Sequence, residues 1–378
     1  MARPHLAALV EDAWNRRKSD TLRERGWGTK IVPHTGYGNV TFVRVLARVL
    51  MSRDPMREVS GDAAGSVQSL KSADEETRGW RAFVTAPAID VPVSVRIGER
   101  VIDGRTDRSG LVDLTIHGHG LGPGWHQVEI SSPLARPRQA SVLVIGTSQT
   151  FGIVSDIDDT VLATSLPRPL IAGWNTFVKA EGTRHPVPGM ATFYRRLMEE
   201  HPGAPIIYLS TGAWNTAPSL TRFLRRNGYP PGPMLLTDWG PTHTGWFRSG
   251  QDHKRSALAR LARELPHVRW LLVGDDGQND PKLYTEFASR RPEAVRGIAI
   301  RQLSVGEQVL SHGIPVANDD LAPAPTEDIA APVVRAPDGY ALSRLVGPIV
   351  SGDVVGADVA ADASAGVRAL EASDMWGV

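Results

Sequence analysis

The chain has 378 residues, which is enough for two or three domains with apolar cores of their own. Its 42 Lys and Arg residues and 41 Asp and Glu residues leave a net charge of +1, which excludes a chain-wide basic field for nucleic acid. Cysteine is absent, which excludes disulfides, thiolate metal sites and a cysteine nucleophile and fits a reducing compartment.

Residues 1–27 are predicted to form an N-terminal amphipathic helix, because apolar residues recur there at helical spacing. Acidic and basic residues interrupt the stretch early, so it lacks the apolar core of a secretory signal. No apolar run in the chain approaches the roughly 20 residues that a membrane-spanning helix needs. A cytoplasmic protein is therefore expected. The basic residues Arg16 to Lys18 offer a route to peripheral membrane contact, and packing on a neighbouring domain is the alternative.

Residues 28–147 follow a two-residue alternation of apolar and polar side chains. The alternating segments are 40–50, 91–97, 111–116, 125–130 and 141–145, and Gly, Pro, Asp and Asn residues separate them. This pattern predicts a small antiparallel β-sandwich domain. The polar stretch 52–77, between the first two strands, is predicted to lack regular structure.

Strand and helix patterns alternate from residue 148 to residue 312. Short apolar strands are expected at 151–154, 205–209, 270–273 and 297–300, with helices at 191–200, 219–226 and 252–265. This alternation predicts an α/β domain with a Rossmann-like, mainly parallel sheet. Residues 313–378 are rich in Ala, Pro and Asp without a sustained period, so they are predicted to be a linker and a tail.

The expected strand at 151–154 runs into the acidic sequence DIDDT. Asp156 and Asp158 point the same way from an extended chain, and Ile157 points into protein. Two neighbouring carboxylates repel each other, so a cation is expected between them, and a hard ion such as Mg²⁺ suits oxygen ligands. The alternative is that this Asp-Asp-Thr sequence only caps a helix.

Polar residues that follow three apolar strands, together with one lysine, make a set able to hydrolyse a phosphate ester. Asp156 is predicted to attack phosphorus and form an aspartyl-phosphate. Asp158 is predicted to protonate the leaving oxygen and then to activate water. Ser210 and Lys254 are predicted to bind the phosphoryl oxygens. Taken alone, each residue has a non-catalytic alternative: Ser210 could cap a helix, and Lys254 could lie on a solvated helix surface.

The same set predicts a magnesium site. Its ligands are expected to be the carboxylates of Asp156 and Asp275 and the main-chain carbonyl of Asp158. Asp280 is expected just outside the ligand shell, where it orients ligand waters or Lys254. The alternative for Gly274 to Gly277 is a tight turn between elements.

Four motifs, in this order, resemble those of the haloacid dehalogenase superfamily of phosphatases: DIDDT (156–160), YLST (208–211), HK (253–254) and GDDGQND (274–280). The longer runs SDIDDTV, IIYLSTGAWN, LLVGDDGQNDPKLY and VRGIAIR are similar to the catalytic domain of actin-patch-protein type phosphatidate phosphatases. This resemblance implies a haloacid dehalogenase-like fold and Mg²⁺-dependent conversion of phosphatidate to diacylglycerol. Thr160 and Thr211 lie within the matching motifs and are expected to support the site.

The spacing of these motifs leaves no room for the cap domain of superfamily members that act on small metabolites, so the resemblance implies an uncapped, open site. Such a site suits a lipid headgroup or a phosphoprotein. Six aromatic residues are candidates for its rim, and a place in the core is the alternative for most of them: Trp174, Phe177, Trp214, Trp239, Trp246 and Phe247.

The sequence therefore predicts a Mg²⁺-dependent phosphatase whose partner is a phosphate-ester substrate, with a membrane lipid as the candidate that the resemblance suggests. A second hypothesis keeps the chemistry and changes the substrate to a phosphoprotein, a sugar phosphate or another lipid phosphate. A third treats the α/β part as a non-catalytic binding module beside the β-sandwich.

Overall fold

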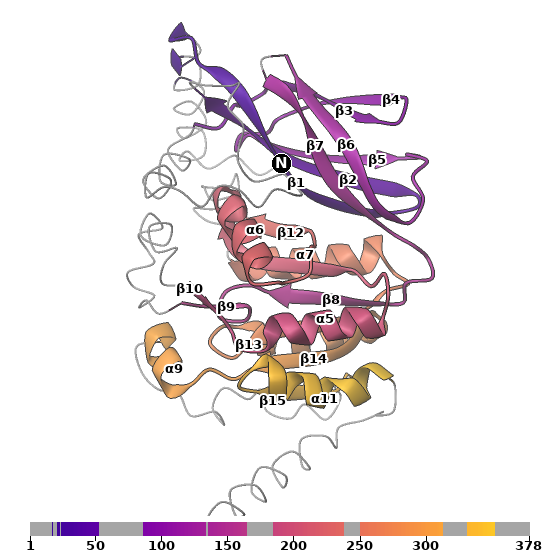
Figure 1. Cartoon of the computed structure of the whole chain (residues 1–378), viewed down its shortest axis with the longest axis vertical. Coiled ribbons are helices and arrows are strands. Elements are labelled where there is room, and N and C mark those ends of the chain that lie inside the picture. The colour runs from indigo at the N-terminus through magenta and orange to yellow at the C-terminus, as the bar shows by residue number, and fades with distance from the viewer. Residues whose placement is uncertain are drawn as a thin grey trace, which may run out of the picture.

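The computed structural model describes residues 17, 21–22, 24–52, 86–133, 135–164, 184–237, 250–312 and 331–351. Two large sheets lie one above the other in Figure 1, the first built by strands between residues 28 and 145 and the second by strands between residues 151 and 336. Most of the predicted N-terminal helix lies outside the described residues, but residues 17, 21, 22 and 24 are helical.

The first sheet has seven strands in the order β4-β3-β6-β7-β1-β2-β5. All its neighbouring strands pair antiparallel except β1 and β7, which pair parallel. The edge strands β4 and β5 approach each other, since a Cβ added at Gly104 would lie 2.7 Å from the Leu114 side chain. The sheet therefore curls into a nearly closed, barrel-like form. Its strands are β1 (Gly28–Asn39), β2 (Phe42–Ser52), β3 (Pro92–Ile97), β4 (Arg100–Arg105), β5 (Leu111–His117), β6 (Gly124–Ser132) and β7 (Ala135–Ile145).

The predicted fold class is wrong for this chain. A small antiparallel sandwich was expected ahead of a mainly parallel, Rossmann-like and haloacid dehalogenase-like sheet. The largest sheet is instead a single mixed one with mostly antiparallel strands. A two-residue alternation shows that a strand is half-buried, but it suits a sandwich and a barrel-like sheet equally well. Which strands become neighbours depends on contacts between segments far apart in sequence.

The second sheet has six strands in the order β12-β11-β8-β13-β14-β15, and all its pairs are parallel. Their carboxyl ends therefore share one edge. The strands are β8 (Phe151–Asp156), β11 (Ile206–Ala213), β12 (Met234–Thr237), β13 (Arg269–Asp275), β14 (Val295–Arg301) and β15 (Val333–Ala336).

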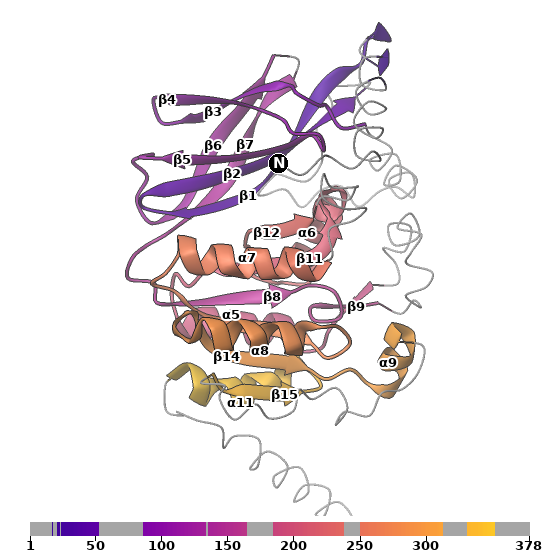
Figure 2. The same cartoon turned by 180° about the vertical axis from the view of Figure 1, so that it is seen from behind.

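Helices cover both faces of this second sheet. Figure 1 shows α5 (Met190–Glu200), α6 (Ala217–Arg226) and α11 (Gly339–Ser351) on one face, and Figure 2 shows α7 (Gly250–Glu264) and α8 (Asp280–Arg290) on the other. Adjacent strand residues enter different cores: Ile153 packs in the cluster with α5, and Val154 packs in the cluster with α7. Burial on both faces explains why these strands are uninterrupted apolar runs in the sequence.

Short elements complete the described structure. The strands β9 (Leu162–Thr164) and β10 (Arg184–Pro186) form an antiparallel pair, and α9 (Val305–His312) follows β14. Two 3₁₀ turns, η3 (Trp214–Thr216) and η4 (Pro292–Ala294), follow β11 and α8. Among the described residues, no helix is both long and apolar enough to cross a bilayer. The sequence predicted that the segments between the motifs are too short for a cap domain. Parts of those segments, residues 165–183 and 238–249, lie outside the described residues.

The two sheets are joined by specific polar contacts. The Tyr37 hydroxyl donates a 2.6 Å hydrogen bond to the Glu264 carboxylate at the end of α7. Asn39 Nδ2 donates to the Glu264 main-chain carbonyl at 3.0 Å. The rings of His34 and Trp214 lie 4.7 Å apart. The first sheet therefore rests on the end of α7 and on the turn that follows β11.

Part of the predicted linker and tail belongs to the second sheet. Residues 331–351 form β15, which pairs parallel with β14, and α11, whose Leu342 and Val346 are fully buried beside α5. A four-residue strand shows no sustained period, so the sequence pattern missed it. The domain boundaries themselves stay a prediction, and residues 313–330 and 352–378 lie outside the described residues.

Replacing Leu342 with Ala tests whether this segment is part of the fold. Leu342 is fully buried, so Leu342→Ala should destabilise the protein by about 2–5 kcal/mol, as large-to-small core substitutions do. Thermal melting of the two proteins measures the effect. Arg344→Ala, on the exposed face of the same helix, is the matched control and should melt with the parent protein. Equal melting of Leu342→Ala and the parent would show that α11 is dispensable for stability.

Candidate active site

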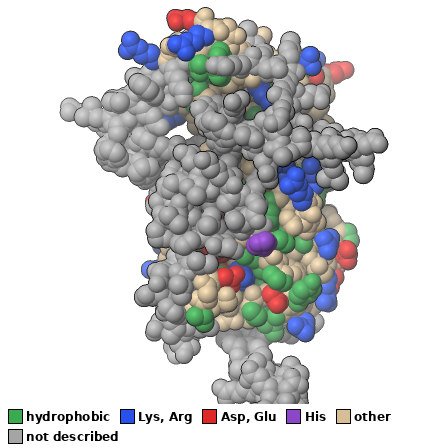
Figure 3. Space-filling model, turned by 60° about the vertical axis from the view of Figure 1, so that its left-hand side comes forward, with side chains coloured by type: hydrophobic (Ala, Val, Ile, Leu, Met, Phe, Trp, Pro, Cys, Tyr) green, Lys and Arg blue, Asp and Glu red, His purple; other side chains and the backbone are tan. Residues whose placement is uncertain are grey.

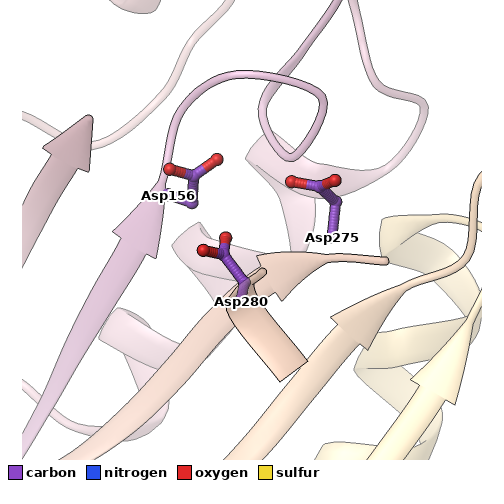
Figure 4. A group of neighbouring side chains, drawn as sticks. All are labelled: Asp156, Asp275 and Asp280. Atoms are coloured by element: carbon purple, nitrogen blue, oxygen red, sulfur yellow. The ribbon is translucent and has the colours of Figure 1, made fainter. Parts of the chain in front are cut away.

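Three buried carboxylates meet at the carboxyl edge of the parallel sheet. Asp156 ends β8, Asp275 ends β13 and Asp280 begins α8. One oxygen of each lies within 4.8 Å of the others, and Figure 4 shows the three side chains converging. The strands β8 and β13 are hydrogen-bonded neighbours, which explains how residues 119 positions apart share one site. We call Asp156, Asp275 and Asp280 the carboxylate cluster.

Lys254 of α7 bridges two members of the cluster. Its Nζ lies 2.6 Å from Asp156 Oδ1 and 2.6 Å from Asp280 Oδ1, and the side chain is only 3% exposed. Burial acts to lower the pKa of Lys254, but the adjacent carboxylates outweigh burial and hold that pKa above its ordinary value. The site therefore contains a fixed positive charge.

The cluster carries more negative charge than Lys254 neutralises. Burial, and then the charges of Asp280 and Asp156, raise the pKa of Asp275 well above its usual range. Burial likewise raises the pKa of Asp156, against the opposing effect of Lys254. Asp280 Oδ2 is buried without a hydrogen-bond partner. Because buried carboxylates that exceed their partners typically bind a cation, these oxygen-only groups fit Mg²⁺.

Asp158, the predicted acid/base group, contacts Ser210, which was predicted to bind the phosphoryl oxygens. Ser210 Oγ donates a 2.9 Å hydrogen bond to Asp158 Oδ2, and the Gly212 main-chain N–H donates to Ser210 Oγ at 2.9 Å. The loop after β8 therefore meets the carboxyl end of β11. The Asp158 carbonyl, predicted as a metal ligand, accepts a 3.3 Å hydrogen bond from Gln278 Nε2, so its role as a ligand stays a prediction.

The predicted supporting residues Thr160, Thr211 and Asp280 have the following contacts. The Thr160 hydroxyl lies 3.5 Å from Asp156 Oδ2 and 3.4 Å from Asp275 Oδ2, between the two carboxylates. The Thr211 side chain borders the start of α7, since a Cβ at Gly250 would lie 2.6 Å from it. Asp280 was expected just outside the ligand shell but lies in the carboxylate cluster itself. Its carboxylate also accepts a hydrogen bond from Lys254 Nζ.

Gly274 allows Asp280 to come this close. A Cβ added at Gly274 would lie 2.7 Å from Asp280 Oδ2, which is closer than real Cβ contacts. The glycine that opens the motif GDDGQND therefore leaves room for the third carboxylate. Gly274 had no such role in the sequence analysis, where a tight turn at Gly274 to Gly277 was considered only as the alternative to a metal site.

Several residues around the site carried no role in the sequence analysis. The Tyr194 hydroxyl of α5 lies 2.6 Å from Ser155 Oγ, directly before Asp156. Arg301 ends β14 at the same edge and is 5% exposed. The sequence did contain a signal for Arg301, because this residue ends an apolar strand just as Asp156 and Asp275 do. Polar residues at such strand ends lie at the edge where α/β sheets place their sites. Nothing in the sequence marked Tyr194, whose partner comes from another element.

Trp214 does not lie on the rim of the site. It is 6% exposed and packs against His34 of the first sheet. Burial lowers the pKa of His34 to about 3, so its ring stays neutral at ordinary pH. The other predicted rim residues lie outside the described residues: Trp174, Phe177, Trp239, Trp246 and Phe247.

Comparison with known proteins connects this geometry to a family. Residues 151–302 match the family model of the phosphatidate phosphatase APP1 catalytic domain. The match includes the carboxylate cluster, Lys254, Asp158 and Ser210. It confirms the predicted resemblance to phosphatidate phosphatases. Membership of the wider haloacid dehalogenase superfamily stays a prediction.

Two curated relatives match the same part of the chain. Phosphatidate phosphatase APP1 of Saccharomyces cerevisiae is 26% identical over 171 residues, which are 45% of this chain and 29% of the yeast protein. An uncharacterized protein of Schizosaccharomyces pombe is 28% identical over 155 residues, which are 40% of this chain and 25% of that protein. The matched segments thus span less than a third of either relative.

Solved structures are only distantly similar. A carbohydrate acetylesterase from Xanthomonas citri aligns with 76% of this chain and 73% of its own, with 10% identity and a TM-score of 0.25. A cycloisomaltooligosaccharide glucanotransferase from Paenibacillus aligns with 81% of this chain and 52% of its own, with 8% identity and a TM-score of 0.17. Scores this low establish neither a common fold nor a common activity.

Removing one charge from the cluster should stabilise the metal-free protein. The raised pKa of Asp275 means that its ionisation destabilises the folded state, and this cost grows as the pH rises above the ordinary value of 3.8. In a chelating buffer at about pH 7.5, Asp275→Asn should therefore melt a few degrees above the parent protein.

The pH dependence provides the control. The gain should shrink towards about pH 4, where the carboxyl group is protonated in both folded and unfolded chains. Differential scanning fluorimetry across the pH range measures it. A metal-free Asp275→Asn protein that melts below the parent at neutral pH would contradict the proposed excess of charge.

Proposed function

We propose that this protein is a phosphatase that hydrolyses phosphatidate to diacylglycerol and phosphate through an aspartyl-phosphate on Asp156. One observation carries the proposal: Lys254 is held between Asp156 and Asp280, with Asp275 alongside, within the segment that matches the phosphatidate phosphatase catalytic domain. A carboxylate beside a fixed positive charge is the arrangement that attack on a phosphate monoester requires.

In the first step, a carboxylate oxygen of Asp156 forms a bond to phosphorus and the bond from phosphorus to the ester oxygen breaks. Asp158 gives its proton to the leaving oxygen, which becomes the alcohol product. Ser210 holds Asp158 through the 2.9 Å hydrogen bond and so fixes the direction of the proton transfer. Lys254 neutralises charge next to the nucleophile and the phosphoryl oxygens.

In the second step, Asp158 accepts a proton from a water molecule as the water oxygen attacks phosphorus. The bond between phosphorus and Asp156 then breaks, which releases phosphate and restores both carboxyl groups. Asp158 suits both steps because its side chain is only half-buried, whereas the Asp156 side chain is buried. Water therefore has access to the acid/base group.

We propose Mg²⁺ as the cofactor, held by Asp156 and Asp275 with the Asp158 carbonyl, and with Asp280 close by. When bound, the ion would offset the charge of the cluster and of the phosphoryl oxygens. The unpartnered Asp280 Oδ2 and the raised pKa values of Asp156 and Asp275 support this assignment.

The lipid substrate is proposed from the family match and from the edge that carries the site. Val305 at the start of α9 is 65% exposed and Tyr340 at the start of α11 is 56% exposed, and both follow strands that end at this edge. Large exposed apolar side chains there suit peripheral contact with a lipid surface. On the face in Figure 3, the described surface mixes apolar, acidic and basic side chains.

A substrate panel with a matched inactive variant tests the activity. The parent protein should release phosphate from phosphatidate in mixed micelles faster than from soluble esters such as p-nitrophenyl phosphate or a sugar phosphate. Asp156→Asn keeps the shape of the side chain but removes the nucleophile, so it should lower kcat by at least about 1000-fold. Phosphate release measures both results.

The control for this experiment is a second acidic variant away from the site. Asp103→Asn lies on β4 of the first sheet and should keep full activity. Faster turnover of a soluble ester would redirect the proposal to another substrate. Unchanged turnover in Asp156→Asn would remove Asp156 as the nucleophile.

Metal removal gives a separate prediction. EDTA should abolish phosphate release and added Mg²⁺ should restore it, because the cluster has an excess of buried negative charge. Mg²⁺ should also raise the melting temperature of the parent protein, through preferential binding to the folded state. This rise should be smaller in Asp275→Asn. Full activity in excess chelator would contradict the role of the metal.

A further inference from the structure

Arg301 lies at the carboxyl end of β14, next to the candidate active site. It pairs in register with Asp275 on β13, and its side chain is almost fully buried. A buried guanidinium has to use its N–H groups in hydrogen bonds, because unmet donors are costly inside a protein. The partners of these N–H groups therefore show what the residue holds in place.

The partners of Arg301 come from three segments around the site. Its Nη1 donates a 2.7 Å hydrogen bond to the main-chain carbonyl of Asp159, in the loop after β8. Its Nη2 lies 2.6 Å from Glu307 Oε1 on α9. Its Nε donates at 3.3 Å to the carbonyl of Pro337, between β15 and α11. One side chain thus ties the loop of the proposed nucleophile to two C-terminal segments.

The loop that Arg301 contacts has a strained backbone. Asp159 has a φ of 60°, a conformation that residues other than glycine seldom adopt. On either side of it, Asp158 carries the proposed acid/base group and Thr160 places its hydroxyl between Asp156 and Asp275. An external hydrogen bond to the Asp159 carbonyl holds this conformation against relaxation.

We infer that Arg301 is a positioning residue for the proposed reaction, which holds the loop 157–162 so that Asp158 faces the substrate. The inference rests on the proposed function. Arg301 does not belong to the carboxylate cluster, and its described hydrogen bonds go to main-chain carbonyls and Glu307. Its effect on the reaction is therefore exerted through the loop.

Arg296 is a matched control on the same strand. It lies near the amino end of β14, and its Nη2 donates a 2.7 Å hydrogen bond to the main-chain carbonyl of Val350 in α11. Both arginines thus join β14 to the C-terminal segment by a bond to a carbonyl. They differ in which end of the sheet they hold.

The test compares Arg301→Lys, Arg301→Met and Arg296→Met in the Mg²⁺-loaded protein. Lysine keeps the charge, but its three donors share one nitrogen and lack the planar spread of the guanidinium, so it should not reach all three segments that Arg301 joins. Arg301→Lys should lower kcat for phosphatidate by about 10- to 100-fold, as small misplacements of reacting groups do, with KM within about threefold of the parent value. Arg301→Met should lose at least as much, and Arg296→Met should keep the parental kcat.

Hydrogen exchange of the loop gives a readout that does not depend on activity. The Asp159 N–H bonds to the Leu162 carbonyl, and the N–H groups of Val161 and Leu162 bond to the Ile157 carbonyl. Exchange of these amides, measured by mass spectrometry, should accelerate in Arg301→Lys and remain parental in Arg296→Met. Glu307→Gln, which weakens the anchor of Arg301 without touching the loop, should give a smaller acceleration.

The two readouts separate the inference from the proposed function. If the parent protein hydrolyses no phosphate ester, the proposed function fails, and faster loop exchange in Arg301→Lys still supports the structural link. Parental exchange and parental kcat in Arg301→Lys would overturn the inference. An equal loss of kcat in Arg296→Met would also overturn it, because the effect would then be one of general stability. If Arg301→Met does not fold, the kcat and the loop exchange of Arg301→Lys and Glu307→Gln test the inference.

Discussion

The buried pairing of Lys254 with Asp156 and Asp280 is the constraint on which the site depends. Its two 2.6 Å contacts hold the proposed nucleophile and join α7 and α8 to the end of β8. Removing charges from water is costly, and a third carboxylate, Asp275, adds repulsion that the lysine cannot offset alone. The arrangement is therefore unfavourable for the metal-free fold and favourable for binding a cation. This is the usual relation between stability and function at such sites.

The rest of the second sheet keeps these groups together. Parallel pairing of β8 with β13 brings Asp156 and Asp275 to one edge, and Gly274 leaves room for Asp280. Behind Asp156, Ser155 and Tyr194 fasten the strand to α5 by a buried 2.6 Å contact between hydroxyl groups. The strands and Tyr194 are packed in the apolar cores on the two faces of the sheet. This close packing keeps the like charges of the carboxylate cluster from moving apart.

Two more distant parts of the chain complete the surroundings. The first sheet meets the end of α7 through Tyr37 and packs His34 on Trp214, directly after β11, the strand that carries Ser210. The segment 331–351 adds an edge strand and a helix and reaches the loop of Asp158 through Arg301. The site is thus built at the meeting of segments that span most of the described chain.

The sequence by itself determined the local features: the apolar runs of β8, β11, β13 and β14, the acidic and basic residues beside them, and the resemblance that the family match confirms. Local periodicity and motif order are sufficient for these, because each depends on neighbouring residues. Only the tertiary structure decided that the N-terminal strands form one nearly closed mixed sheet, that residues 331–351 belong to the parallel sheet, and that Asp280 joins the carboxylate cluster. It also decided the partners of Tyr194 and Arg301. These outcomes depend on contacts between segments far apart in the chain, and no local pattern encodes which segments meet.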